Sequence, residues 1–280
     1  MRESLKRRGK ELGLALLNFA LVLCLLFGTQ ALIRGRVRET GGQVILSAVV
    51  FAAYLAGRRW IEGGQPPELV RKGGVTEFAK GVGLGIALFS SVMGLLWIFG
   101  AYHPSGHGSV SGLAIGALTA LMVGIGEETL VRGFVFRIVE IAGGTWIGVV
   151  VSSALFGAGH AFNPGATVIS SIAIALEAGV LLAAAYVVTG RLWFPIGLHA
   201  AWNFTEGSLF GMSVSGYSTP GWLAGTLKGP AALTGGAFGP EASIFAVAVC
   251  LAVAVLLLWR TVQLHRVKAP MWNPTKANTH

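Results

Sequence analysis

Long apolar segments recur along the chain, and they constrain its fold more than any other feature of the sequence. Eight of them approach the roughly 20 apolar residues that a helix needs to cross a bilayer core: residues 12–33, 43–57, 81–102, 113–136, 145–162, 167–188, 193–212 and 244–259. Only 12% of the 280 residues are charged, whereas a soluble domain has roughly a quarter. The chain therefore needs lipid around it.

Each segment is predicted to be α-helical, because backbone polar groups in hydrocarbon must find hydrogen-bond partners within their own segment. No polar stretch between the segments is large enough to fold separately. We expect an all-α fold, a polytopic transmembrane helical bundle of about eight membrane helices that forms a single membrane domain over residues 1–280. Short basic tails are expected at residues 1–11 and 267–280.

The net charge of +9 comes from Lys and Arg residues in short clusters beside the apolar segments. This pattern is typical of topology anchors rather than of a nucleic-acid-binding face, so no nucleic-acid partner is expected. With both termini cytoplasmic, eight crossings place residues 58–80, 137–144 and 190–192 on the inner side. The loops 103–112 and 163–166 contain no Lys or Arg and fall outside.

The arginines Arg34, Arg36 and Arg38 disagree with this topology, because they fall in a loop that it places outside. Either these side chains extend to an interface or one of the first two helices does not fully cross. The Gly- and Pro-rich segment 213–243 is expected to cap the outer face.

Charged residues interrupt the fourth apolar segment. Glu128 and Arg132 are four residues apart, about 40° around a helix, which predicts an ion pair between them. Glu127 lies about 100° from Glu128 and is left for another partner. In the alternative interpretation, the helix simply ends in solvated charges at a membrane boundary. Since the chain has no Asp, an aspartate dyad and a Ser-His-Asp triad are excluded.

Two later segments contain histidines. His160 follows Phe156 by one helical turn, and a buried histidine of this kind is often structural. His199 and Asn203 are four apart on one face, where an interhelical hydrogen-bond pair is the alternative. Together with Glu127, these residues match what amide hydrolysis requires. A carboxylate and a histidine can activate water, and side-chain donors can stabilise an oxyanion.

Three short motifs occur in order: Glu127-Glu128 followed by Arg132, Phe156-x-x-x-His160, and His199-x-x-x-Asn203. In their order and spacing they resemble the CPBP family, the CAAX proteases and bacteriocin-processing enzymes also called Abi proteins. The resemblance covers residues 113–205, which we interpret as the catalytic core.

The resemblance implies an intramembrane glutamic endopeptidase that uses no cofactor. Glu127 would be the general base, His160 would help to hold the water, and His199 with Asn203 would form the oxyanion site. Glu128, Arg132 and Phe156 would support the site. Its substrate would be a peptide or lipidated peptide reached from the membrane or the inner face. Economical loops and short termini favour a prokaryotic plasma membrane.

Glu177 lies outside these motifs, and we expect it to line the water cavity or to satisfy a helix contact. Three alternatives to a glutamate-dependent peptidase remain. Two histidines and a glutamate are possible zinc ligands, although there is no His-Glu-x-x-His motif. A proton-coupled transporter is a second alternative, with the buried Glu and His residues as its relay. A non-catalytic scaffold or immunity factor with the family fold is the third.

Overall fold

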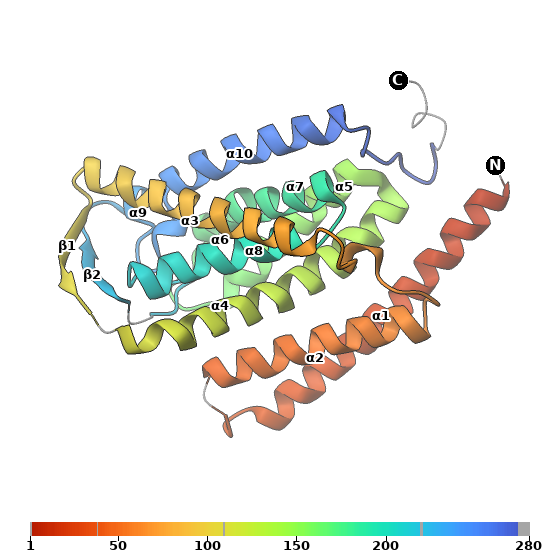
Figure 1. Cartoon of the computed structure of the whole chain (residues 1–280), viewed down its shortest axis with the longest axis horizontal. Coiled ribbons are helices and arrows are strands. Elements are labelled where there is room, and N and C mark those ends of the chain that lie inside the picture. Colours follow the sequence, from red (N-terminus) through yellow and green to blue (C-terminus); the bar gives the residue numbers. More distant parts are fainter. Residues whose placement is uncertain (1, 38, 109, 219–220, 274–280) are drawn as a thin grey trace.

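The computed structural model describes residues 2–37, 39–108, 110–218 and 221–273, and most of them are helical (Figure 1). The α-helices are α1 (Arg2–Ile33), α2 (Glu39–Trp60), α3 (Gly74–Ile98), α4 (Leu113–Glu128), α5 (Arg137–Gly159), α6 (Val168–Ile174), α7 (Val180–Thr189), α8 (Trp193–Asn203), α9 (Ala231–Thr234) and α10 (Ile244–Gln263). Three π-helical segments continue them: η3 (Thr129–Phe136), η5 (Ala175–Gly179) and η6 (Phe204–Leu209). Short 3₁₀ turns are η1 (Pro67–Leu69), η2 (Val110–Gly112), η4 (His160–Phe162) and η7 (Pro240–Ala242). The chain is an all-α polytopic membrane protein, as its apolar segments predicted.

Six helical stretches in the described part of the chain are long and apolar enough to cross a membrane. They are Leu5–Ile33, Thr40–Trp60, Gly74–Ile98, Leu113–Phe162, Val168–Thr189 and Ile244–Gln263. The fourth is 50 residues long and contains two of the predicted segments. The predicted segment 193–212 is not among the six, because α8 and η6 together have only 17 residues, fewer than the roughly 20 that a crossing needs. The number of crossings, about eight, stays a prediction.

The prediction that residues 137–144 form an inner loop is wrong in one respect, because most of these residues are helical. Helix α5 already begins at Arg137, and the direction of the chain changes only at Gly144, whose φ is 79°. A Cβ at Gly144 would lie 2.7 Å from the carbonyl oxygen of Lys268, so a larger residue would displace the C-terminal segment there. Apolar residues on both sides of a polar stretch do not show whether a helix continues through it.

A two-stranded antiparallel sheet, absent from the sequence prediction, joins two segments expected to be loops. Strand β1 (Tyr102–His107) pairs with β2 (Leu223–Leu227), with Tyr102 opposite Leu227. The sheet lies at one end of the bundle (Figure 1). It brings part of the segment 213–243 beside the end of α3.

Glycines allow α3 and α8 to pack closely. A Cβ at Gly81 would lie 2.2 Å from the carbonyl oxygen of Phe194, and one at Gly197 would lie 2.3 Å from that of Phe78. Contacts this short require that neither residue has a side chain. The pairing of α3 with α8 therefore fixes the helix that contains His199.

Helices α1 and α2 form a hairpin beside the bundle (Figure 1). Only 17% of the apolar window of α1 and 22% of that of α2 is buried, against 56% for Val168–Thr189. The hairpin turn contains Arg34 and Arg36, and Arg36 donates to the carbonyl oxygen of Leu32. Arg38 lies outside the described residues, so the question of whether both helices cross stays open.

The predicted tails make specific contacts. Residues 2–11 belong to α1. Lys268 forms an ion pair with Glu140 (2.7 Å), and its backbone N–H donates to the Thr145 hydroxyl. Arg8 donates to the carbonyl oxygen of Ala269. The C-terminal segment, up to residue 273, is thus held at the start of α5, and residues 274–280 lie outside the described chain.

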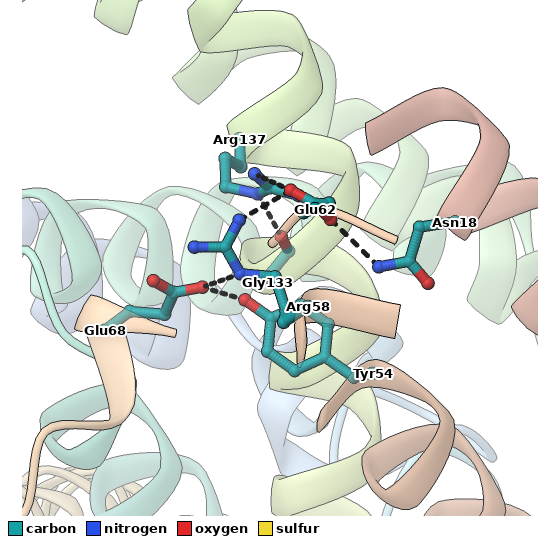
Figure 2. Close-up of polar contacts among 7 residues, drawn as sticks. All are labelled: Asn18, Tyr54, Arg58, Glu62, Glu68, Gly133 and Arg137. Atoms are coloured by element: carbon teal, nitrogen blue, oxygen red, sulfur yellow. Dashed lines mark hydrogen bonds and ion pairs between the residues drawn. The ribbon is translucent and has the colours of Figure 1, made fainter. Parts of the chain in front are cut away.

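A polar cluster attaches the hairpin to the bundle (Figure 2). We call Asn18, Tyr54, Arg58, Glu62, Glu68 and Arg137 the Glu62 cluster. The Glu62 carboxylate accepts two hydrogen bonds from Arg137 (both 2.8 Å), one from Asn18 (2.9 Å) and one from Arg58 (2.5 Å). Burial by itself raises the pKa of Glu62, but these donors outweigh it and hold the pKa below its ordinary value.

Candidate active site

Three π-helical segments contain polar residues of the bundle interior: η3 contains Arg132, η5 contains Glu177 and η6 contains Glu206. A π-helix is rare, and one that interrupts an α-helix often lies at a functional site, because its wider turn changes the direction of side chains and leaves backbone groups free. The pattern of apolar and polar residues does not indicate where these π-helical segments lie. Their location makes the region between them the first candidate for a site.

Glu128 and Arg132 form the ion pair that their spacing predicted, with 2.7 Å between Oε1 and Nη1. Neither side chain is exposed. The same Glu128 oxygen lies 3.1 Å from Nδ1 of His199. Because a carboxylate can only accept, His199 donates through Nδ1. Glu128 thus connects η3 with α8 and orients the imidazole.

Arg132 also contacts two other elements. Its Nη2 donates to the carbonyl oxygen of Gly179 (3.0 Å), at the end of η5. Its guanidinium lies 4.8 Å from the centre of the Phe156 ring, within cation–π distance. One buried arginine therefore joins η3, α5 and η5, and its position depends on all three.

Phe156 packs against both imidazoles. Its ring centre is 4.6 Å from that of His160 and 6.0 Å from that of His199. Nδ1 of His160 lies 2.7 Å from the carbonyl oxygen of Phe156, which can only accept, so Nδ1 donates. In the neutral ring, Nε2 then has a lone pair free for another donor.

Glu127 lies on the other side of His199. Its Oε2 is 3.9 Å from Nε2 of that histidine, which is too far for a direct hydrogen bond. A water molecule can contact both groups, because the separation is less than twice the length of about 2.8 Å of a hydrogen bond. The Glu127 side chain is 38% exposed, so it is not sealed within the protein.

The two imidazoles share one small cavity of about 20 Å³, which is room for a water molecule. Its polar lining consists of His160, Glu177, His199, Asn203, Ser215 and Glu241. The structure thus brings together three of the four residues predicted to be catalytic. The fourth, Glu127, is not in the lining and approaches it through His199. Glu177, expected to line a cavity or satisfy a helix contact, is in the lining.

Two lining residues, Ser215 and Glu241, come from the segment 213–243 that was predicted only to cap the bundle. The cavity therefore extends towards that segment. Glu241 is the only carboxylate in the segment. Its isolation in a Gly- and Pro-rich stretch is a signal that sequence reasoning missed, and sequence spacing does not show that such a loop folds back into the bundle.

Within the described residues, no group of three or more His, Cys, Asp or Glu side chains is arranged to hold a metal ion. His160, His199 and Glu127 do not form such a group.

Comparison with known proteins gives one match. The family model described as Rce1-like, Type II CAAX prenyl endopeptidase Rce1-like, matches residues 109–205. No curated protein and no solved structure matches the chain. The matched segment contains all three motifs and ends before Glu206 and Glu241. Residues 109–205 of this integral membrane protein match the Rce1-like family model, as the resemblance to the CPBP family predicted.

Proposed function

We propose that the protein is an intramembrane endopeptidase that hydrolyses peptide bonds of membrane-associated substrates with a water activated by Glu127. The family match supports a membrane protease in general. The observation that supports the finer mechanism is the geometry of His199, with Glu128 at 3.1 Å from one ring nitrogen and Glu127 at 3.9 Å from the other.

In this mechanism the attacking water donates one hydrogen bond to Glu127 and the other to Nε2 of His160. Both groups are acceptors, so they orient an oxygen lone pair towards the substrate carbonyl. The oxygen bonds to the carbonyl carbon while its proton moves to Glu127. When the carbon–nitrogen bond breaks, Glu127 passes that proton to the leaving amine. The products are a carboxylic acid and an amine, and the site returns to its starting state.

His199 and Asn203 stabilise the oxyanion that forms during the attack. Because Nδ1 of His199 donates to Glu128, only the cationic ring has an Nε2–H left for the oxyanion. The Asn203 side-chain amide supplies a second donor. Donors that are in position before the reaction need no reorganisation as charge develops. Glu128, Arg132 and Phe156 hold them there.

The substrate class in this proposal is a peptide or lipidated peptide that enters from the membrane or its surface. The proposed location is a prokaryotic plasma membrane with both termini in the cytoplasm. Basic residues support this orientation, since Arg58, Arg59 and Arg260 lie in the last turns of α2 and α10. Cysteines introduced into the β1–β2 sheet should react with an impermeant reagent added from outside the cell.

The test of the mechanism uses the purified full chain in detergent and a fluorogenic peptide linked to a lipid anchor. Glu127→Ala is expected to reduce kcat by about 10²–10⁴, the usual contribution of a general base. Glu140→Gln is the control, because it alters a buried carboxylate that does not line the cavity. Equal turnover by wild type and Glu127→Ala would refute the proposal. Loss of activity with a strong chelator and recovery with zinc would favour the zinc alternative.

A further inference from the structure

Three buried carboxyl groups meet beside the cavity, and the mechanism above uses none of them. Glu177, Glu206 and Glu241 have 1%, 0% and 3% of their surface exposed. They come from η5, η6 and η7. Each has at least one carboxyl oxygen without a hydrogen-bond partner in the part of the chain that the structure describes. Unpaired buried oxygens are costly, so their presence calls for an explanation.

Glu241 is the member of this group that the fold directs to the site. It lines the cavity together with His160 and Ser215. The residue two positions before it, Gly239, has φ 130° and packs so closely that a Cβ would lie 2.2 Å from the carbonyl oxygen of Ser213. Only glycine suits this turn. A constrained turn therefore brings one carboxyl from the segment 213–243 into a cavity formed by the Rce1-like domain.

Glu241 is paired with Glu206. The two carboxyls lie close enough to repel each other when both are ionised and to share a proton when one of them is protonated. Adjoining buried carboxyls do not both ionise, so when the pair loses its first proton the remaining proton is shared between the two groups and the pair has a single negative charge. Burial raises the pKa of Glu241, while hydrogen bonds from Glu206 and Ser215 and the neighbouring His160 act in the opposite direction.

We propose that Glu241 is a positioning residue of the peptidase site: its ionised carboxylate, hydrogen-bonded by the protonated carboxyl of Glu206, acts on His160. Nδ1 of His160 is already bonded to the carbonyl oxygen of Phe156. A negative charge near the ring makes the free Nε2 a stronger acceptor, and this is the atom that would hold the attacking water. Glu241 thus acts through His160 and does not itself touch the substrate.

The groups that face Glu241 come from several elements. Glu206 and Glu177 interact with it from η6 and η5, and His160 from η4. The titratable residue of α10 in this region is Cys250, which interacts with Glu177 and Glu206. Helices α6 and α9, which also pack near η7, contain no ionisable side chain. Among these groups, His160 is the only base, and in the proposed mechanism its ring is neutral with Nε2 as an acceptor.

This inference rests on the proposed function and gives it a pH signature. Catalysis needs Glu241 ionised, so kcat falls as the pH falls through the raised pKa of Glu241. Glu241→Gln keeps the shape of the side chain but cannot ionise. At neutral pH it should reduce kcat about tenfold, with KM within about twofold, because the water and not the substrate loses its positioning. The variant should also lack the acid limb of the kcat profile, which is the fall of kcat at low pH that protonation of Glu241 causes.

A second pair of variants keeps the test independent of folding defects in Glu241→Gln. Glu206→Leu removes the donor that stabilises ionised Glu241, so the acid limb of kcat should move to higher pH. Glu206→Gln still donates through its amide, so the limb should stay closer to that of wild type. Glu140→Gln is again the matched control, and thermal unfolding in detergent shows whether each variant is folded.

The outcomes separate the two proposals. If wild type and Glu127→Ala cleave the peptide equally, the proposed function fails and this inference fails with it. If Glu127→Ala is inactive but Glu241→Gln keeps the kcat and the acid limb of wild type, only the role of Glu241 is refuted. The same holds if Glu206→Leu leaves the limb where it is.

Discussion

The Glu62 cluster and the active-site region contain the same types of side chain, yet they pair their charges differently. In the Glu62 cluster, both oxygens of Glu62 accept hydrogen bonds, four in all, from Asn18, Arg58 and Arg137. In the site, Glu128 shares one oxygen between Arg132 and His199, while its other oxygen has no partner among the described residues.

This difference indicates what each region does. A carboxylate that accepts hydrogen bonds at both oxygens holds two helices together and has no acceptor site left for a ligand. Unpaired buried oxygens reduce stability, and a fold retains them where a water, a proton or a substrate is to be bound. Substitutions in the Glu62 cluster are therefore expected to change stability alone, and substitutions in the active-site region to change both stability and catalysis.

The largest effect is expected from Glu128→Ala. It leaves the buried Arg132 without its partner, which should cost about 3–5 kcal/mol, and it removes the acceptor that orients His199. We expect turnover to fall at least about 100-fold. Thermal unfolding in detergent and peptide cleavage, measured on the same preparation, check both effects. Wild-type turnover in a folded Glu128→Ala protein would contradict the assigned role of His199.

Arg137→Ala should have an intermediate effect, and on stability only. It removes two of the four hydrogen bonds to the largely buried Glu62 side chain, at a cost of about 1–3 kcal/mol, while kcat stays within about twofold. Arg36→Ala, in the exposed hairpin turn, is the control and should leave the unfolding midpoint unchanged. A large loss of turnover in folded Arg137→Ala would remove the distinction between the two clusters.

The smallest effect concerns the pH dependence of stability. Burial raises the pKa of Glu68 above 4.5. The folded state therefore binds this proton more tightly than the unfolded state, and stability falls as the pH rises from 4.5 through the raised pKa. Glu62 has a lowered pKa, so it contributes the opposite trend, a loss of stability as the pH falls below 4.5.

Glu68→Gln should cancel the first trend and leave the second. The test is the difference in unfolding midpoint between Glu68→Gln and wild type, measured at about pH 5 and at about pH 7.5. This difference should favour the variant more at the higher pH. Equal pH profiles for the two proteins would mean that Tyr54 and Arg58 fully compensate for the burial of Glu68.

Local features of the site were predictable from the sequence, and long-range features were not. The spacing of Glu128 and Arg132 was sufficient to predict their ion pair, because a helix fixes the geometry of residues four apart. The contact of Glu128 with His199 joins residues 71 positions apart. The position of Glu241 in the cavity depends on a constrained turn at Gly239, and nothing in residue spacing indicates where that turn leads.

The sequence by itself determined that this chain is a helical membrane protein, because long apolar segments must satisfy their backbone within helices wherever lipid replaces water. It also determined which polar residues lie inside those helices. Only the tertiary structure decided which of them meet, since the α3–α8 contact, the π-helical turns and the β1–β2 pairing depend on side-chain packing between distant segments. Such packing joins residues far apart in the chain, and the spacing of residues along the sequence does not show which distant segments pack together.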